Sequence, residues 1–509
     1  MSKYFSLIFG LIALHLFYGN FYVASAYYNQ AVGPSDQNKD DLAIANYTKA
    51  IELDPKNVKA YYDRGLAYSG QLKYDLAISD YNKVIELDPK FLLAYFKRGL
   101  TYTKQAKDDL VIADFTKVIE LDPKNVFAYF NRGLTYAKQN KYDDDLDLAI
   151  ADFTKAIELN PKFADAYNNR GLAYRNQLKY DLAIADYNKA IELDPKNVFA
   201  YNSRGLAYAK QAKYDLAIAD YNKAIELDSK FADAYDNRGL AYAKQTKYDL
   251  TIADFTKVIE LTPRYAFAYY NRGFTYSKQE KYDLAIADYN KAIELDPKNV
   301  FAYFNRGLTY AKQAKYDLAI ADYDKAIEVD PKYVIAYNNR GLAYSTQLKY
   351  DLAIADYNKA IELDPKNAFA YNFRGLAYAE QNKYDDDLDL AIADFTKAIE
   401  LNPKFSFAYY KRGNAYAKQN KYNDDLDLAI ADFTKAIELN PKFSFAYYKR
   451  GNAYDEQKKY LLAIADFTKA IELNPKHADA YNNRGLAYKA IGKTTEADAD
   501  FETAEELKK

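Results

Sequence analysis

Two oppositely charged residues recur together along the 509-residue chain. An Arg stands before a Gly from Arg64 to Arg484, and an Asp stands just before an aromatic residue from Asp80 to Asp500. A guanidinium that leaves water needs acceptors for its donors, and a carboxylate supplies two. We therefore expect each Arg to form an internal ion pair with an Asp, within one repeat or between neighbours. The alternative is that the Arg methylenes cover the core while the guanidinium reaches water.

Aromatic residues occupy two positions shortly before this Arg and form two rows along the sequence. Aromatic side chains that are exposed in a row favour interfaces, so the two rows are candidates for an interaction surface. The alternative is that some of these rings pack into the seam between repeats. The first row holds Phe127, Phe199, Phe267, Phe301, Phe369, Phe407 and Phe445, with Asp165, Asp233 and Asp479 in other repeats. The second row holds Phe96, Phe130, Tyr270, Phe304, Tyr410 and Tyr448, with Asn168, Asn202, Asn338 and Asn372 in other repeats.

An Asn directly precedes the recurring Arg in many repeats. Its amide can donate to and accept from a peptide backbone at the same time. A row of such residues, one repeat apart, could hold an extended peptide without reading its side chains. The alternative is a set of ordinary exposed polar residues, since Ser203, Phe373, Lys411 and Lys449 interrupt the row. The row consists of Asn131, Asn169, Asn237, Asn271, Asn305, Asn339 and Asn483.

The residues that most enzymes and metal sites use are scarce in this chain. Cysteine is absent and only His15 and His477 occur, so thiolate and His-based sites are not expected. Runs of Asp at 143–145, 385–387 and 424–425 suggest calcium, but they lack the Gly turn and closing Glu of an EF-hand loop. We predict no metal, no cofactor and no enzymatic activity. With 70 basic and 72 acidic residues and no basic block, the chain is not expected to bind nucleic acid.

A fixed period organises all of these residues. A Pro closes each repeat from Pro55 to Pro475 at steps of 34 residues, except for three steps of 38, and Ser229 replaces it once. Each repeat shows two helical faces, joined by a polar segment and ended by the Pro. In the repeat at 300–333 the faces consist of Tyr303, Gly307 and Tyr310, and of Ala319, Tyr323 and Ala326.

This repeat resembles the tetratricopeptide repeat family. The family pattern has an aromatic, a Leu-Gly pair, Tyr, Ala, an aromatic, Ala and Pro within 34 residues. Two departures from this pattern recur in the chain. Tyr replaces the first Trp, and Arg replaces the Leu before Gly. Counted from Val58, thirteen such repeats cover residues 58–509. The residues that match in order are Tyr303, Gly307, Tyr310, Ala319, Tyr323, Ala326 and Pro331.

The resemblance implies an all-α solenoid of stacked antiparallel helix pairs, wound as a right-handed superhelix. It also implies that the aromatic and Asn rows line a concave groove that binds partner peptides. Glycosyltransferase members of the family use an Asn ladder of this kind. Chaperone-binding members clamp a C-terminal carboxylate with Lys and Asn, but only Asn414 and Asn452 match that pattern in part. The rival interpretation is a structural or surface-displayed protein whose repeats mainly provide length.

The two ends differ from the repeats. Residues 1–26 have Lys3, an apolar stretch from Tyr4 and the small residues Ala24-Ser25-Ala26, which predicts a signal peptide and an exported protein, periplasmic, secreted or on the cell surface. The alternative is an uncleaved membrane anchor through residues 4–26. Residues 27–57 are interpreted as a degenerate first repeat, interrupted by Gly33-Pro34. The charged C-terminal repeat is expected to form a polar cap.

Overall fold

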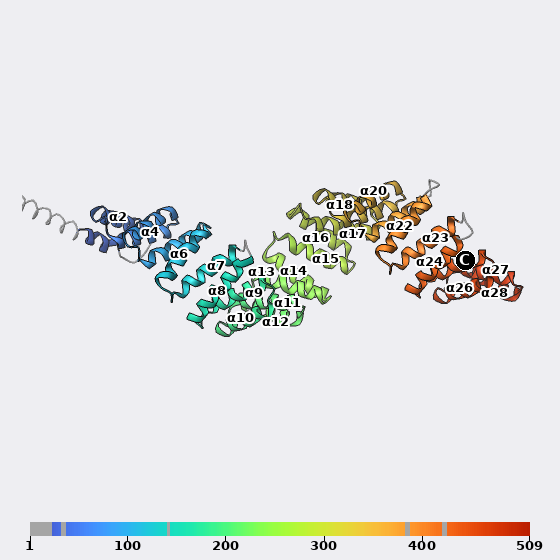
Figure 1. Ribbon diagram of the computed structural model, residues 1–509, viewed down its shortest axis with the longest axis horizontal. Coiled ribbons are helices and arrows are strands. Elements are labelled where there is room, and N and C mark those ends of the chain that lie inside the picture. Colours follow the sequence, from blue (N-terminus) through green and yellow to red (C-terminus); the bar gives the residue numbers. More distant parts are fainter. Residues whose placement is uncertain (1–22, 32–36, 140–142, 382–386, 420–424, 509) are drawn as a thin grey trace, which may run out of the picture. The chain divides into compact units, whose positions relative to one another are not determined.

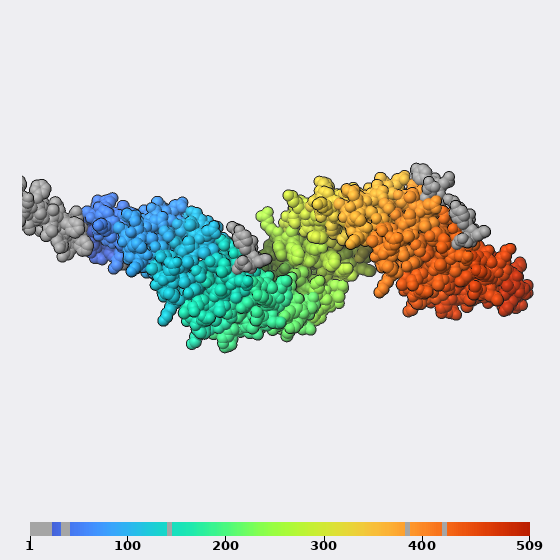
Figure 2. Space-filling model, viewed as in Figure 1, coloured from blue at the N-terminus to red at the C-terminus, as the bar shows by residue number. Residues whose placement is uncertain are grey.

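A computed structural model describes residues 23–31, 37–139, 143–381, 387–419 and 425–508. Every regular element in these ranges is an α-helix, and none of the described residues lies in a strand. The chain divides into two compact arrays, which we call the N-terminal array (Met1–Leu261) and the C-terminal array (Thr262–Lys509). Figure 1 shows successive helix pairs stacked within each array, and Figure 2 shows that their side chains form a continuous surface. The all-α solenoid prediction is confirmed.

Each repeat contributes one first helix and one second helix, and consecutive helices pack against each other. The first helices are α3 (Val58–Gly70), α5 (Leu92–Lys104), α7 (Val126–Gln139), α9 (Ala164–Asn176), α11 (Val198–Lys210), α13 (Ala232–Lys244), α15 (Ala266–Lys278), α17 (Val300–Lys312), α19 (Val334–Thr346), α21 (Ala368–Gln381), α23 (Ser406–Gln419), α25 (Ser444–Glu456) and α27 (Ala478–Ala490). The second helices are α2 (Gln37–Leu53), α4 (Tyr74–Leu87), α6 (Asp108–Leu121), α8 (Asp143–Leu159), α10 (Tyr180–Leu193), α12 (Tyr214–Leu227), α14 (Tyr248–Leu261), α16 (Tyr282–Leu295), α18 (Tyr316–Val329), α20 (Tyr350–Leu363), α22 (Asp387–Leu401), α24 (Asp425–Leu439), α26 (Tyr460–Leu473) and α28 (Thr494–Lys508).

Local sequence explains where these helices begin and end. Before α17, the Asn299 side chain accepts a hydrogen bond from the Ala302 amide at 3.0 Å, which caps a free N–H of the first turn. Between α17 and α18, Ala314 adopts a left-handed φ of 56°, and the Lys315 amide then donates to the Tyr310 carbonyl at 2.9 Å. This closure satisfies a terminal carbonyl of the first helix and reverses the chain within a few residues.

The core of each repeat is a close contact between a Gly of the first helix and an aromatic ring of the second. Tyr323 is fully buried in α18, and a Cβ added at Gly307 of α17 would lie 2.8 Å from its ring. No side chain fits in that space, so Gly allows the two helices to approach. Ala319 and Ala326 are also buried beside the ring, which explains why small residues recur on this face.

The recurring Arg and Asp form an ion pair inside every full repeat. In α9 and α10, Arg170 Nε and Nη2 donate to the two carboxylate oxygens of Asp186 at 2.8 and 2.7 Å. Arg170 Nη1 also donates to Thr154 Oγ1 of the preceding repeat at 3.1 Å, so one side chain joins two repeats. The predicted pairing is confirmed in all thirteen repeats. Burial raises the pKa of several of these carboxyls, such as Asp114, although Arg98 opposes the rise.

The first helices form the inner layer of each array. Successive first helices contact one another directly, as α11 does with α9 and α13, and as α17 does with α15 and α19. Second helices instead pack mainly on the first helices before and after them. A surface that bends brings its inner elements closer together, so the exposed face of the first helices is the concave one.

The N-terminal residues are described only from Val23. Residues 23–31 are helical, and Tyr28 packs against Tyr47 of α2 and donates to Asp63 of α3 at 2.8 Å. Most of the predicted signal peptide, and the predicted break at Gly33-Pro34, lie outside the described residues. Among the helices that are described, none combines the length and hydropathy needed to cross a membrane.

Candidate peptide-binding groove

The concave face of each first helix is set by helical spacing. Residues three and four apart share a face, so Phe301, Phe304, Leu308 and Ala311 of α17 form one stripe. Gly307 lies on another side and contacts the second helix. The open part of each stripe lies on the concave side of the first helices, while some of its residues, such as Phe304, also pack against the second-helix ring. We call the surface made by these stripes the groove.

The first aromatic row lies on the open surface of the groove. Phe199 is 66% exposed and Phe301 is 56% exposed, although both belong to regular helices. Four rings of this row, those of Phe127, Phe199, Phe301 and Phe445, contact the aromatic residue that precedes the next first helix, as Phe301 does Tyr333 with ring centroids 6.0 Å apart. Phe267 instead contacts Tyr265, and Phe369 contacts Phe373. Exposed rings also occur at Phe127, Phe267, Phe369 and Phe445, whereas Phe407 is partly buried.

The second aromatic row lies deeper, in the seam between repeats. Phe304 is only 7% exposed and packs between Tyr323 at 5.8 Å and Tyr333 at 5.3 Å. On the neighbouring helices α15 and α17, the first-row rings of Phe267 and Phe301 are therefore exposed, while Phe304 is a packing residue. The other members of the second row are partly buried against the second-helix aromatic of their own repeat: Phe96, Phe130, Tyr270, Tyr410 and Tyr448. Their assignment to a binding site stays a prediction.

The Asn row lies in the groove, but its amides have local partners. Asn305 Nδ2 donates to the Phe301 carbonyl of its own helix at 2.8 Å and lies 3.2 Å from the Tyr270 hydroxyl. The same bond to the carbonyl four residues earlier is made by Asn131, Asn169, Asn271 and Asn339. Asn237 instead bonds Asn202, and Asn483 bonds Tyr448 and Asn452. These bonds use part of the hydrogen-bonding capacity that backbone capture requires, so the ladder also stays a prediction.

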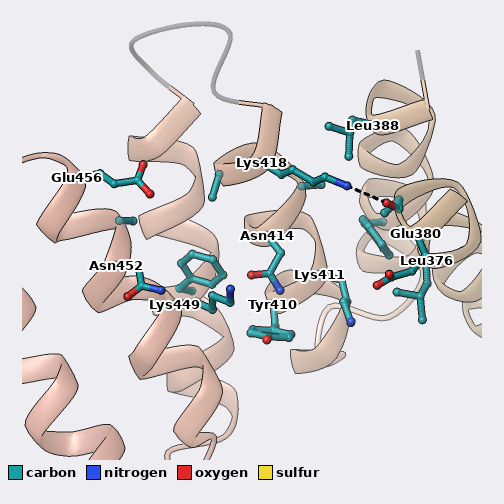
Figure 3. A pocket seen from close by; sticks show the side chains of 16 residues that line it. Leu376, Glu380, Leu388, Tyr410, Lys411, Asn414, Lys418, Lys449, Asn452 and Glu456 are labelled. Atoms are coloured by element: carbon teal, nitrogen blue, oxygen red, sulfur yellow. Dashed lines mark hydrogen bonds between the residues drawn. The ribbon is translucent and has the colours of Figure 1, made fainter. Parts of the chain in front are cut away.

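A cavity of about 490 Å³ opens in the C-terminal array among α21, α22, α23, α24 and α25. Figure 3 shows Lys411, Asn414 and Lys449 around its middle, with Glu380 on one side and Glu456 on the other. Burial lowers the pKa of Lys411, Glu380 opposes that change, and Lys449 adds to it. Sequence reasoning treated these lysines only as interruptions of the Asn row. The available signal was that Lys and Asn replace the usual residues together, in two successive repeats.

One carboxyl in the groove of the N-terminal array has an unusual environment. Asp236 of α13 stands where α9 and α11 carry Asn168 and Asn202. Its Oδ1 atom is buried and has no hydrogen-bond partner among the described residues. Burial and the nearby Asp233 raise the pKa of Asp236 to about 6.

The Asp-rich segments lie at or just before the start of three second helices, α8, α22 and α24. Asp385, Asp386 and Asp424 lie outside the described residues, as do the side chains of Asp143 and Asp144. Asp145, Asp387 and Asp425 are buried near the start of α8, α22 and α24. Within the part of the chain that the structure describes, no three His, Asp or Glu side chains are grouped closely enough to hold a metal ion.

The helix pairs are stacked one after another. In each pair, the residues that contact the second helix recur from repeat to repeat, while those in the groove vary. This arrangement defines a helical-repeat solenoid. The chain belongs to the tetratricopeptide repeat family, because the models of that family together match most of its length. Three of these models are described as tetratricopeptide repeat. The first matches residues 58–91, 164–197, 198–231, 266–299, 300–333, 334–367 and 444–477. The second matches residues 115–147 and 467–499, and the third matches residues 92–125, 232–265 and 408–443. A fourth, described as TPR repeat, matches residues 36–71, 144–177 and 386–420.

Several solved structures are similar to parts of the chain. YrrB, described as a TPR protein with an unusual peptide-binding site, is 29% identical over 37% of this chain and 95% of its own, with a TM-score of 0.32. MamA is 30% identical over 34% of this chain and 91% of its own, with a TM-score of 0.31. Yeast Tom70 is 19% identical over 87% of this chain and 97% of its own, with a TM-score of 0.37. A search of curated proteins found no match.

Proposed function

We propose that this protein is a non-catalytic scaffold that binds proteins or peptides along the groove of its first helices. The observation that carries the proposal is the row of exposed Phe side chains at one groove position. A large apolar ring on the surface of an ordered helix contributes little to the fold, while at an interface it supplies desolvated contact area. Because the row recurs from repeat to repeat, a partner that lies along the groove would meet several rings in succession.

Partner capture tests this proposal. The full chain would be used as bait, and bound proteins would be identified by mass spectrometry. The test variant carries Phe267→Ala and Phe301→Ala on α15 and α17, whose rings are exposed. We expect captured partners to bind this variant more weakly by about 1–4 kcal/mol, the range for truncated interface anchors.

A matched control uses exposed apolar residues of the same repeats that lie outside the groove. Leu284 of α16 and Leu318 of α18 are each 50% exposed on second helices. Leu284→Ala with Leu318→Ala removes a similar kind of exposed surface, and we expect it to retain the partners. If the groove variant and the control retain them equally, the groove proposal is wrong.

A structural role is the second candidate. Four second helices, α10, α12, α16 and α20, have the identical sequence YDLAIADYNKAIEL, which is consistent with repeats multiplied to give length. This role requires no saturable partner. Saturable binding to a captured protein would favour the scaffold, while display on a cell surface with no saturable partner would favour the structural role.

We also propose that the protein acts outside the cytoplasm, either exported or anchored in a membrane by residues 4–26. The support is the arrangement of a positive start, an apolar stretch and small residues in residues 1–26. N-terminal sequencing of native material tests it. A mature chain that begins at Tyr27 would indicate export with cleavage, and an intact Met1 in a membrane fraction would indicate the anchor.

A further inference from the structure

A row of exposed Leu side chains lies on the second helices, away from the groove. Each second helix from α2 to α26 carries one of them near its start, with exposed fractions of 45–62%. We call these side chains, from Leu42 to Leu462, the Leu row. Figure 1 shows three helices that carry it, α16, α18 and α20, following one another along the C-terminal array. A single exposed Leu is ordinary, but one in every repeat forms a periodic apolar surface.

The fold does not require Leu at this position, because the last repeat carries Glu there. Glu496 occupies it near the start of α28, is exposed, and lies 3.4 Å from the Lys493 ammonium. The helix pair packs as in the other repeats, since a Cβ added at Gly485 would lie 2.7 Å from the Phe501 ring. A carboxylate also suits the positive end of the helix dipole. Leu in all the earlier repeats therefore indicates an interaction surface rather than a packing requirement.

Each Leu stands beside a small residue on the same exposed stripe. Ala321, three residues after Leu318 in α18, is also exposed. Residues three apart share a face of a helix, so each second helix presents one large and one small apolar side chain. Farther along α18 the stripe ends in the salt bridge of Lys325 with Glu328, at 2.5 Å. A surface with the same alternation can place its Leu on this Ala, as facing layers of a core do.

Hydrogen bonds between repeats hold the Leu row at a constant spacing. Asp317, directly before Leu318, accepts from Gln347 Nε2 of the next repeat at 2.8 Å. In the N-terminal array, Asp181 accepts from Gln211 Nε2 at the same distance. These bonds join the start of each second helix to the end of the next first helix. A partner that covers several repeats must therefore present apolar side chains at this fixed spacing.

We propose that the Leu row binds the Leu row of a second copy of this chain. A stable interface covers about 800 Å² on each partner, and one repeat supplies only a single Leu and a single Ala, so several consecutive repeats must be covered together. Another copy presents the same side chains at the same spacing, and two-fold symmetry makes such a patch complementary to itself.

The charges around the Leu row agree with this partner. Exposed Lys315 and Asp317 flank Leu318, so a two-fold axis sets the Lys of one copy against the Asp of the other. With 70 basic and 72 acidic residues, the chain has no excess charge that would favour a strongly acidic or basic partner. The inference does not rest on the proposed function, because the groove lies on the first helices.

Sedimentation equilibrium of the full chain tests this inference. The test variant replaces two row residues in each array with the residue that α28 already carries. We expect the wild type to form dimers and the variant to do so at least about a hundredfold more weakly, because each copy loses apolar contacts and gains like charges. The substitutions are Leu182→Glu, Leu216→Glu, Leu318→Glu and Leu352→Glu.

A matched control changes the net charge equally at exposed turns that follow second helices. We expect it to form dimers as the wild type does, and equal weakening would show a general charge effect and overturn the inference. If the Glu variant loses helicity by circular dichroism, Leu→Ala at the same four positions replaces it, with dimers expected to be about tenfold weaker. The control substitutions are Lys196→Gln, Lys230→Gln, Lys332→Gln and Lys366→Gln.

Cysteine cross-linking locates the contact. The sequence contains no Cys, so a single introduced thiol can form a disulfide only with a second copy. Single-Cys chains are mixed in pairs under mild oxidation, and we expect disulfides between particular positions of the Leu row and none from Lys332→Cys. Dimers in which no row positions cross-link would overturn the inference. The row substitutions are Leu182→Cys, Leu216→Cys, Leu250→Cys, Leu284→Cys, Leu318→Cys and Leu352→Cys.

Three other outcomes would also overturn the inference. The wild type could stay monomeric up to about 100 µM, in which case a captured protein that the Glu variant loses would assign the row to a different partner. Association could persist in the Glu variant, for example through residues 1–26. Dimers could instead be lost in the Phe267→Ala, Phe301→Ala variant, which would place the contact in the groove. None of these results decides the proposed function, which partner capture with the groove variant tests separately.

Discussion

The two faces of each first helix carry different kinds of sequence. The face toward the second helix keeps the same residue types throughout, with Tyr303, Gly307 and Tyr310 repeated in their equivalents. The groove face changes from repeat to repeat, so that Phe301 corresponds to Asp233 in another repeat. The constant face is buried against a ring or an ion pair, where almost no other side chain fits. The exposed positions of the groove face, such as Phe301, have no such constraint, whereas Phe304 on the same stripe is packed. Under the proposed function, partner binding would use these exposed positions.

The largest effect on the constant face should come from the ion pair. Arg306→Met keeps the aliphatic part of the side chain but leaves the carboxylate of Asp322 buried without its partner. We expect the variant to be less stable by about 3–5 kcal/mol, because an uncompensated buried charge is costly. Repeat arrays do not unfold in one two-state step, so native-state hydrogen exchange of α17 and α18 is the appropriate measurement. As a control, Lys325→Ala breaks an exposed ion pair with Glu328 and should leave exchange unchanged.

The two aromatic rows should respond differently to truncation. Phe304→Ala empties a site enclosed by Tyr323 and Tyr333, and we expect a loss of about 3–4 kcal/mol. Phe301→Ala, three residues away on the same helix, removes an exposed ring and should change stability by less than about 0.5 kcal/mol. Hydrogen exchange of the same helices would compare them. Similar losses in both variants would show that the two rows do not differ in burial.

The Gly–aromatic contact should tolerate no added carbon. Gly307→Ala places a Cβ 2.8 Å from the Tyr323 ring, and we expect a loss of about 1–3 kcal/mol from overpacking. Gly70→Ala is the matched control, since an added Cβ there meets nothing within 4 Å. Alanine favours helices over glycine, so this control should be neutral or slightly stabilising. Native-state hydrogen exchange would compare the two variants, measured at α17 and α18 for Gly307→Ala and at α3 and α4 for Gly70→Ala.

An effect that depends on pH should appear on the groove face, at Asp236. Burial and Asp233 raise the pKa of this carboxyl to about 6 in the folded chain, above the unfolded value of 3.8. The protonated form is therefore favoured by folding, and stability is lost as the pH rises from about 4 to about 6. Asp236→Asn removes the charge, so we expect the variant to be more stable than the wild type by about 1–3 kcal/mol near pH 7. Below about pH 4 the difference should vanish. Denaturation at several pH values tests this, and a difference independent of pH would contradict it.

The sequence predicted the fold closely because the constraints that set it are local and periodic. The spacing of Tyr303, Gly307 and Tyr310 identifies the first helix, and Pro331 marks the end of the second helix. Neither inference needs information from residues far away in the sequence. The Arg–Asp pairing was also predictable, because a buried guanidinium needs an anion and only one Asp position, that of Asp322, is filled in every full repeat. Each of these inferences gained weight from thirteen repetitions of the same environment.

The candidate site was harder to predict, since burial within the groove depends on neighbouring repeats. Phe301 and Phe304 are both Phe on the same helical stripe, yet their exposed fractions are 56% and 7%. Phe304 differs because Tyr323 and Tyr333 from two other elements close over it. A sequence pattern gives the direction of a side chain on its own helix, but it does not give the rings that the next repeat places against it.

The sequence by itself determined the helix pairs, their order and the residues that hold each pair together, because these depend on contacts within a repeat. Only the tertiary structure decided which aromatic row is exposed, which Asn amides already donate to their own helix, and that Lys411 and Lys449 share one cavity. The physical reason is that the surface of a repeat array is assembled from several repeats at once. The chemistry of that surface depends on how neighbouring repeats pack and on the charges of their side chains. The sequence of a single repeat does not specify either of these.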